Sequence, residues 1–375
     1  MTFKIGITCY PTVGGSGVVA TELGKALAEK GHEVHFITSS LPYRLDNCTA
    51  NIYYHEVEVN QYSVFRYPPY DLALASKMAD VIKREGLDLL HVHYAIPHSI
   101  SAYLAKQMVD RDVKIVTTLH GTDITVLGYD PSLIDMIRFG IERSDAVTAV
   151  SNDLIDQTKE LLNIDTPIET VYNFVDHRIY YPREVDHMRQ KYGIGEKTKV
   201  ISHISNFRKV KRVQDVVYVF ERINQQMDAV LLLIGDGPEL TVIADLVKEL
   251  GLTDRVRFLG NQKLVAEFLS MSDVNLLLSE KESFGLVILE AMACGVPVIG
   301  TNIGGIPEVI EHGKNGYICP LGDIDEISTH AISLLQDVEL QKRMSQSAKV
   351  RAISTFHQDL IVSQYEKVYE DTLKK

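Results

Sequence analysis

The chain has 375 residues, of which 45% are hydrophobic and 23% charged, and its formal net charge is −12. That length exceeds what one hydrophobic core usually organises, so we expect two domains in an ordinary globular protein. The acidic balance argues against a nucleic-acid-binding protein, which would normally be basic. An anionic ligand would have to be bound by a few local cations and by helix N-termini.

Cysteine usage and the N-terminal sequence indicate the compartment. The four cysteines, at 9, 48, 294 and 319, are widely spaced and form no CxxC pair. This pattern predicts neither a structural zinc site nor a disulfide framework. Residues 1–7 lack the features of a signal peptide, and no run reaches the ~20 apolar residues of a membrane span. We therefore expect a cytoplasmic protein with reduced thiols.

Short apolar runs alternate with amphipathic stretches in both halves of the chain. Runs typical of buried strands lie at 3–8, 33–38, 89–93, 113–118 and 146–150, and again at 200–204, 229–234, 256–258, 274–278 and 298–301. Stretches with helical spacing include 18–30, 97–109 and 131–143. Strand–helix alternation predicts parallel βαβ units, and hence two Rossmann-like domains of the α/β class.

The domain boundary is expected near residues 170–185, where the strand pattern restarts after a loop rich in Asp, Tyr and Pro. We assign residues 1–170 to the first domain and 171–356 to the second. The last stretch, from about residue 340, has helical spacing throughout. Because open α/β sheets bind ligands at the carboxyl ends of their strands, a site is expected in the cleft between the two domains.

A glycine-rich loop follows the first predicted strand. Residues 14–17 read Gly-Gly-Ser-Gly and precede a helix. The pattern matches neither the dinucleotide fingerprint nor a P-loop. Two interpretations remain open, a phosphate approach at a helix N-terminus and a tight turn that needs positive φ.

Histidines end two other strands of the first half. Residues 120–123 read His-Gly-Thr-Asp, and His91 and His93 lie two residues apart on one strand face. A strand's carboxyl end favours a functional role for His120 over a structural one. The His91–His93 pair lacks a nearby carboxylate or cysteine set, which argues against a metal site.

A basic loop opens the second domain. Residues 205–212 read Ser-Asn-Phe-Arg-Lys-Val-Lys-Arg, so four cations fall within five residues of an acidic chain. One interpretation is a clamp for a diphosphate, which suits charge-assisted hydrogen bonds. The other is an exposed loop solvated by water.

The strongest signal is a pair of glutamates eight residues apart, Glu282 and Glu290. A helix over residues 284–293 would place Glu282 in the preceding loop and Glu290 two turns inside, up to ~12 Å away along the axis. That spacing suits the two ends of a nucleotide sugar better than a hydrolase's carboxylate pair. The helix is apolar nearly all round, which predicts that Glu290 is enclosed and needs a partner. The amides of Phe284, Gly285 and Leu286 are expected to form an anion site.

Two further glycine loops follow strands, at 235–239 and 304–308. The first is interpreted either as a plain turn or as a contact to a nucleotide base, and the second pairs glycines with a helix start. Two Asp-x-Asp triplets, at 110–112 and 323–325, are interpreted as a turn and a helix cap rather than as metal sites.

Together these motifs resemble the family-4 retaining glycosyltransferases of the GT-B fold. The resemblance covers nearly the whole chain and rests on the segments 14–17, 120–123, 282–285, 295–298 and 304–308, with Lys211 and Glu290. It implies a fold of two Rossmann-like domains, no metal cofactor, and a terminal helix, about 357–375, that packs on the first domain. A homodimer is a further expectation from the family.

The resemblance also implies roles for residues that bind the donor. Glu282 matches the glutamate that holds sugar hydroxyls, Glu290 the one that binds the ribose, and Lys211 the lysine that neutralises the diphosphate. Asn206 stands where the family usually has an arginine, which makes Arg208 the candidate for the second positive charge. His120 matches the histidine near C6 of the sugar and is, with Lys211 and Glu282, a predicted catalytic residue. The remaining predicted donor contacts are Gly15, Asn206, Ser283, Phe284, Gly285 and Leu286.

Segments 6–11, 67–71 and 205–212 resemble more closely those members that act in the bacillithiol pathway. These transfer N-acetylglucosamine from its UDP donor to L-malate and retain the α configuration. Malate is a dianion, so its site needs hydrogen-bond donors, for which we select Ser16, Tyr94, Thr118 and Arg138. The alternative for Arg138 is a surface ion pair.

Other functions remain as alternatives. A related transferase would use another acceptor, and a UDP-sugar 2-epimerase of the same fold would need none. A nucleotide-binding regulatory module would bind UDP and release no product. An NAD oxidoreductase is least favoured, because neither half has the GxGxxG fingerprint with a following acidic residue.

Overall fold

The computed structural model describes residues 2–12, 14–45, 50–59, 67 and 69–375. The chain divides into two compact units, Met1–Asn173 with Asp359–Lys375, and Phe174–Gln358. These limits differ by two or three residues from the predicted ones. Predicted residues that lie outside the described part are Cys48 and Pro68, the latter in the 67–71 segment.

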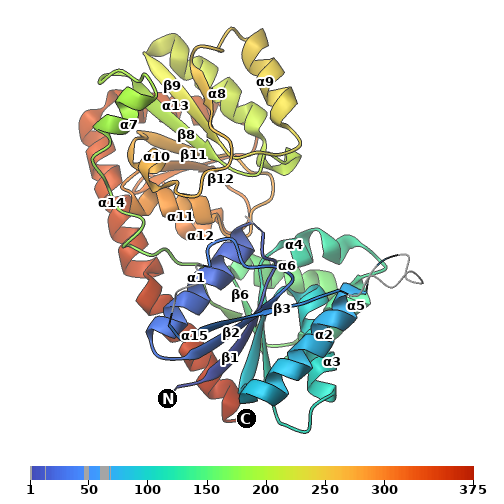
Figure 1. The fold of residues 1–375 in the computed structure, drawn as a ribbon. Coiled ribbons are helices and arrows are strands. Elements are labelled where there is room, and N and C mark those ends of the chain that lie inside the picture. The colour runs from blue at the N-terminus through green and yellow to red at the C-terminus, as the bar shows by residue number, and fades with distance from the viewer. Residues whose placement is uncertain (1, 13, 46–49, 60–66, 68) are drawn as a thin grey trace. The chain divides into compact units, whose positions relative to one another are not determined.

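The first unit is built on a seven-stranded sheet in the order β3-β2-β1-β4-β5-β6-β7 (Figure 1). Its pairs are parallel, as the strand–helix alternation predicts. The strands are β1 (Lys4–Thr8), β2 (Glu33–Thr38), β3 (Ile52–Glu56), β4 (Leu89–His93), β5 (Lys114–Leu119), β6 (Ala146–Ala149) and β7 (Glu169–Thr170). Strands β2 and β4 have the predicted limits.

Seven α-helices of the described residues belong to this unit, and all but the C-terminal one lie between its strands in the chain. They are α1 (Gly15–Glu29), α2 (Tyr70–Val81), α3 (Ile100–Gln107), α4 (Thr122–Thr125), α5 (Ile134–Glu142), α6 (Asn152–Leu162) and α15 (Gln358–Leu373). The helix predicted over 97–109 is shorter, because a π-helical turn at Ala95–Ser99 with a non-helical residue inside it precedes α3. That irregular turn directly follows β4, at the end of the sheet where ligands are expected.

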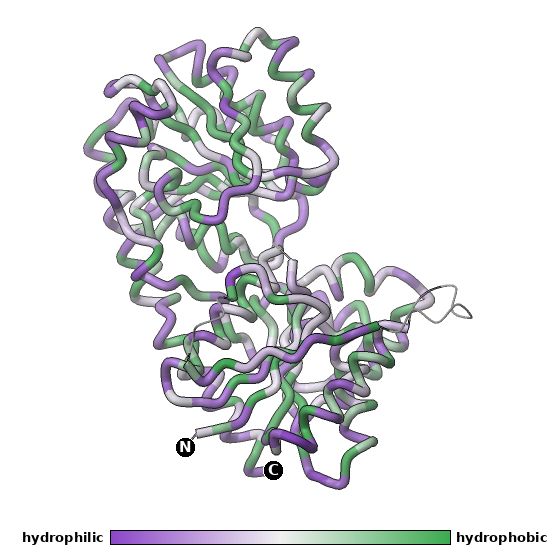
Figure 2. Tube along the Cα trace, viewed as in Figure 1, coloured by the Kyte–Doolittle hydropathy of each residue, from purple (hydrophilic) through white to green (hydrophobic). Residues whose placement is uncertain are grey.

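The second unit holds a six-stranded sheet in the order β10-β9-β8-β11-β12-β13. Its strands are β8 (Lys199–Ile204), β9 (Ala229–Ile234), β10 (Val256–Phe258), β11 (Val274–Leu277), β12 (Val298–Thr301) and β13 (Gly316–Cys319). Its helices are α7 (Asp186–Lys191), α8 (Val213–Gln226), α9 (Leu240–Glu249), α10 (Ala266–Ser270), α11 (Leu286–Ala293), α12 (Ile306–Val309), α13 (Ile324–Gln336) and α14 (Val338–Phe356). Figure 2 shows apolar residues concentrated along the central strands of each unit.

Both sheets reverse their direction of growth at one point. In the first unit the chain moves outward from β1 to β3 and then returns to place β4 on the other side of β1. The second unit does the same around β8 and β11. In open α/β sheets, the carboxyl ends of the strands at such a reversal are the usual place for a ligand.

The C-terminal helix is part of the first unit. Tyr365 and Tyr369 of α15 are buried, and Tyr369 Oη lies 2.7 Å from Nδ1 of His91 on β4. Glu366 adds a 3.0 Å contact to His32 and an ion pair to Lys30. The terminal segment is thus bound to the sheet by buried polar contacts as well as by apolar packing.

We predict that Tyr369→Phe destabilises the first unit by about 1–3 kcal/mol, because it leaves a buried ring nitrogen of His91 without its partner. Urea unfolding followed by proteolysis of the first unit measures this, and Tyr53→Phe, at an exposed position on β3 of the same unit, is the matched control. Equal midpoints for the two variants would contradict the expected contribution of this bond.

Candidate functional site

Three loops of the second unit meet at the carboxyl ends of the neighbouring strands β8, β11 and β12. The backbone N–H of Glu280 donates to the carbonyl of Val210 at 2.8 Å, which joins the basic loop to the loop before α11. The N–H of Gly305 donates to the carbonyl of Glu282 at 3.1 Å. Sheet order therefore brings together motifs that lie up to 100 residues apart.

Lys211 and Glu282 form an ion pair where these loops meet. Lys211 Nζ lies 2.7 Å from a carboxylate oxygen of Glu282, and the two side chains are 19% and 16% exposed. Ser279 Oγ lies 3.4 Å from the same oxygen. The pair is shielded enough to be ordered and open enough to exchange partners with a ligand.

Helix α11 begins beside this pair with an uncapped N-terminus. Its N-cap, Gly285, has φ of +91°, and no side chain accepts a hydrogen bond from the first turn. The preceding Phe284 is buried, with its ring 5.7 Å from that of Phe356. The first amides of α11 and the positive end of its dipole are therefore suited to an anion, as the sequence predicts.

Glu290 lies inside the second unit and is 5% exposed. The hydroxyl of Tyr180 donates to one of its carboxylate oxygens at 2.6 Å. This confirms that the residue is enclosed and partnered, while its role toward a ribose stays a prediction. The partner was not predicted, because Tyr180 lies in an irregular segment 110 residues away in sequence.

The remaining basic-loop residues differ in their surroundings. Asn206 and Arg208 are exposed, whereas Arg212 is held by Asp215 at 2.6 Å. Arg208 therefore stays our candidate for a second positive charge. A Cβ on Gly237 would come within 1.9 Å of the Asn206 carbonyl oxygen. Close packing thus accounts for a glycine in the 235–239 loop and favours the interpretation as a turn.

His203 fixes the start of the basic loop. Its Nδ1 lies 2.9 Å from the Leu276 carbonyl oxygen, and its Nε2 lies 2.8 Å from Ser205 Oγ. Burial lowers the pKa of His203 to about 4, so the ring is neutral. It donates from Nδ1 to the carbonyl and accepts from the serine hydroxyl at Nε2, which orients the loop that carries Lys211.

In the first unit, the glycine loop leads directly into α1. Gly14 and Gly15 are exposed and have no positive φ, so the tight-turn explanation is wrong for them. A Cβ on Gly15 would meet nothing within 4 Å among the described residues, whereas one on Gly17 would lie 2.4 Å from the Tyr10 carbonyl oxygen. Gly17 is thus required by packing, and Gly15 leaves the helix N-terminus open to a ligand.

Two of the four predicted acceptor residues are in contact. Ser16 Oγ donates to Tyr94 Oη at 3.1 Å, which links the start of α1 to the end of β4 across the reversal point of the sheet. Tyr94 has φ of +94°, a strained conformation for a residue with a side chain. Strained backbone conformations cluster at functional sites, because they destabilise the fold and persist where the function needs them.

The other two predicted acceptor residues, Thr118 and Arg138, form hydrogen bonds to other parts of the first unit. Thr118 is buried, with its hydroxyl 2.7 Å from His91 Nε2 and 2.7 Å from Thr148 Oγ1. Arg138 donates to the Leu162 carbonyl at 2.9 Å and pairs with Asp135 at 2.9 Å. Arg138 thus takes the surface ion pair that was its alternative interpretation. A ligand would have to displace these bonds to use either side chain.

Four histidines, His91, His93, His98 and His120, cluster on and just after the central strands β4 and β5. His91 and His93 stack with ring centroids 4.4 Å apart, and His93 Nδ1 lies 2.7 Å from His120 Nε2. Burial lowers the pKa of His91 and His120 to about 3 and that of His98 to about 4, and lowers that of His93 strongly. All four rings are therefore neutral at pH 7.

We predict that acid destabilises the first unit before the second. A histidine with a lowered pKa in the fold binds its proton more readily when unfolded, so stability is lost as pH falls from about 6.5 toward 4. Each such group contributes a slope of about 1.4 kcal/mol per pH unit. Asp123 opposes them between about 4 and 6, because burial raises its pKa to about 6.

Pulse proteolysis in urea at pH 7.5 and pH 5.5, with cleavage sites read by mass spectrometry, tests this order. Among the described residues of the second unit, fewer histidines have a lowered pKa, namely His203 and His330. Equal stability of the first unit at the two pH values would contradict the prediction.

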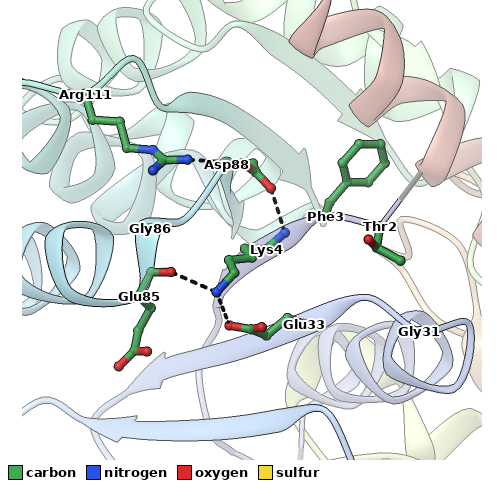
Figure 3. Close-up of a pocket in the computed structure, with 9 residues that line it drawn as sticks. All are labelled: Thr2, Phe3, Lys4, Gly31, Glu33, Glu85, Gly86, Asp88 and Arg111. Carbon is green, nitrogen blue, oxygen red and sulfur yellow. Dashed lines mark hydrogen bonds and ion pairs between the residues drawn. The ribbon is translucent and has the colours of Figure 1, made fainter.

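A polar pocket lies at the other end of the first sheet, near the amino ends of β1, β2 and β4 (Figure 3). Lys4 bonds Glu33 at 2.9 Å and the Glu85 carbonyl at 3.1 Å, while Arg111 pairs with Asp88 at 3.2 Å. Because these charged groups satisfy one another, and because ligands of open sheets bind at the carboxyl ends, this pocket is not the candidate site. Arg111 belongs to the first Asp-x-Asp triplet, which lies in the short connection between α3 and β5, as predicted.

The second triplet is a helix cap, as predicted, since Asp323 accepts from the N–H of Glu326 at 2.9 Å. Nearby, ligand atoms of Cys319, Glu326 and His330 lie within 4.8 Å of one another. Sequence spacing did not indicate this group. Burial raises the pKa of the Cys319 thiol to about 12, so a metal ion would have to displace its proton. The absence of a metal requirement stays a prediction.

Comparison with known proteins identifies the class. A model described as Glycosyltransferase Family 4 matches residues 13–178, and one described as Glycosyl transferases group 1 matches residues 184–351. The chain is a glycosyltransferase of this family, with the GT-B fold. It is 64% identical over 374 residues to the N-acetyl-alpha-D-glucosaminyl L-malate synthase of Bacillus anthracis, covering 100% of this chain and 98% of that protein.

More distant relatives agree. An uncharacterised glycosyltransferase of Methanocaldococcus jannaschii is 28% identical, with 96% of each chain covered. Among solved structures, a glycosyltransferase from Rickettsia africae has a TM-score of 0.85 at 22% identity, covering 100% of this chain and 99% of that one. Anabaena HepE in complex with UDP and glucose has a TM-score of 0.84 at 20% identity, covering 98% and 99%. Within the described residues, no helix has the length and apolar character needed to cross a bilayer.

Proposed function

We propose that this glycosyltransferase moves N-acetylglucosamine from UDP-N-acetylglucosamine to the hydroxyl of L-malate, with retention of the α configuration. The observation that carries the proposal is the Lys211–Glu282 pair beside the uncapped N-terminus of α11. The full-length similarity to the B. anthracis enzyme supports the choice of N-acetylglucosamine and malate.

The donor binds to the second unit. Its diphosphate takes Lys211 and the first amides of α11, where a mobile cation and fixed dipoles meet. Glu282 then turns from Lys211 to the sugar hydroxyls, a partner exchange that the partial exposure of both side chains permits. Glu290 and its surroundings receive the ribose, and Arg208 adds charge to the diphosphate.

Malate binds to the first unit, where Ser16 and Tyr94 supply hydroxyl donors beside the open N-terminus of α1. Two carboxylates require several donors, and the free amides of a helix start can serve one of them.

The reaction forms a bond between the malate hydroxyl oxygen and the anomeric carbon and breaks the bond from that carbon to the phosphate oxygen of UDP. The hydroxyl proton passes to the leaving phosphate, so the new bond forms on the same face as the old one. Lys211 and the α11 amides stabilise the charge that develops on UDP, which is usually the largest catalytic contribution. No metal ion takes part in this scheme.

The direct test is release of UDP by the pure protein from UDP-N-acetylglucosamine, with and without L-malate, in the presence of EDTA. Release that needs malate and survives EDTA supports donor, acceptor and metal independence together. Conversion of the donor without an acceptor would instead indicate a 2-epimerase. Binding of UDP without any product would indicate a regulatory module. UDP release that malate does not support but another hydroxy acid does would mean that this other acid is the acceptor.

We predict that Tyr94→Phe raises the KM for L-malate about 10-fold and changes the KM for the donor little, because it removes one hydrogen bond to a charged acceptor. Ser16→Ala has an effect of the same size, and Arg138→Met, whose guanidinium is already paired, has less. Steady-state kinetics with each substrate varied in turn separates the two constants. A larger effect from Arg138→Met than from Tyr94→Phe would reassign the acceptor site.

A further inference from the structure

The contact between His93 and His120 has a direction that the surroundings determine. His93 is fully buried, whereas His120 is half-buried at the end of β5. The pKa of each is lowered, so both rings are neutral and each carries one proton. One ring must donate and the other accept across the 2.7 Å between His93 Nδ1 and His120 Nε2.

The other nitrogen of His93 decides which ring donates. His93 Nε2 is buried and has no hydrogen-bond partner among the described residues. If His120 donated, His93 would carry its own proton on Nε2 and bury an N–H without an acceptor. Buried donors without acceptors are rarer and costlier than buried acceptors without donors. The proton of His93 is therefore on Nδ1, and His93 donates to His120 Nε2.

We infer that His93 is a positioning residue that holds His120 in the Nδ1–H tautomer, so that His120 presents a hydrogen-bond donor to the sugar nucleotide. This inference rests on the proposed function for the identity of that ligand. The tautomer of a neutral histidine is set by the hydrogen bond that its other nitrogen makes. For His120 that bond comes from the neutral imidazole of His93 rather than from a carboxylate.

The backbone around His120 is held separately. The carboxylate of Asp123 accepts from the N–H groups of Gly121 at 2.9 Å, of His120 at 3.3 Å and of Ala95 at 3.1 Å. These bonds fix the position of the loop but do not touch the imidazole. Asp123 thus places His120, and His93 sets which of its nitrogens bears the proton.

The tautomer can be observed without any activity measurement. Protein labelled with ¹⁵N in its histidines is examined by long-range ¹H–¹⁵N correlation at pH 7.5, and His120→Asn identifies the His120 signals. In the unsubstituted protein we expect His120 protonated on Nδ1. His93→Leu should shift His120 away from that state, whereas His93→Asn, whose side-chain amide can still donate from nearly the same place, should retain it.

Kinetics then tests whether the reaction uses the proton. We expect His93→Leu to lower kcat/KM for the donor about 10-fold, the usual worth of one oriented hydrogen bond, and His93→Asn to restore most of it. KM for malate should change little in either variant. A structural role alone would not produce rescue by asparagine together with a matching return of the tautomer.

A His120 ring protonated on Nε2 in the unsubstituted protein, or a tautomer unchanged in His93→Leu, would overturn the inference whatever the rates. A shifted tautomer with unchanged kinetics would overturn the use of this proton by the reaction. Failure of malate-dependent UDP release in the unsubstituted protein would overturn the proposed function instead, and the spectra would still report the tautomer.

Discussion

Replacing Lys211 by methionine is expected to lower kcat about 100- to 1,000-fold, the range seen when one preorganised group that stabilises developing charge is removed. The side chain keeps its apolar length in the Lys211→Met variant and loses only the ammonium group. Because the charge on UDP grows as its bond to the sugar breaks, the loss falls on turnover more than on ground-state binding. UDP release at saturating donor and malate measures the change.

Lys209→Met is the matched control. Lys209 lies on the same short helical turn, Lys209–Lys211, and is exposed. The Lys209→Met substitution removes the same charge from the same loop as Lys211→Met, so any general effect of the loop's charge appears in both variants. A similar loss of turnover in both would mean that the loop acts through its summed charge and that Lys211 has no special position.

The second large effect is expected at Glu282. We predict that Glu282→Ala lowers kcat/KM for the donor about 100-fold, because hydrogen bonds between a carboxylate and hydroxyls contribute about 1.5–3 kcal/mol each. Glu282→Gln keeps the shape and one acceptor oxygen, so it should lose less. Both variants also release Lys211 from its 2.7 Å ion pair, which favours phosphate binding and limits the loss in KM.

Glu280→Gln serves as the control for Glu282, since Glu280 lies two residues earlier and is exposed, 3.9 Å from Arg212. Rates for Glu282→Ala that match the unsubstituted enzyme would remove Glu282 from the donor site. A double-mutant cycle with Lys211→Met then shows whether the two side chains act on the same substrate group, because contacting residues that share a function are not additive.

The two predictions concern residues whose types and local positions were readable from the sequence. Lys211 stood out as one of four cations within five residues of an acidic chain, and Glu282 stood out by its place before an apolar helix. The apolar helix itself, observed as Leu286–Ala293, also predicted the burial of Glu290. Strands β2, β4, β9, β10 and β12 have the predicted limits, because each is a short run rich in apolar residues between turn residues.

Two of the strands at sheet edges, β3 and β13, were missed for a physical reason. β3 and β13 end the order of their sheets, and their residues are in part exposed. A half-exposed strand needs no continuous apolar run, so the signal that marks a buried strand is absent. The acceptor residues show a related limit, since Thr118 and Arg138 were chosen by type and lie in other hydrogen bonds.

The sequence alone determined the class of most buried strands and of the helices between them, the division into two α/β units and the side chains available after each predicted strand, because hydrophobic periodicity and turn chemistry are local properties. Only the tertiary structure decided which of those side chains meet. Strand order placed Lys211 beside Glu282 and His93 on His120, across 71 and 27 residues. Packing of an irregular segment against α11 placed Tyr180 on Glu290, 110 residues away. Such contacts depend on how sheets pack and on which buried polar atoms find partners, and neither leaves a periodic trace in the chain.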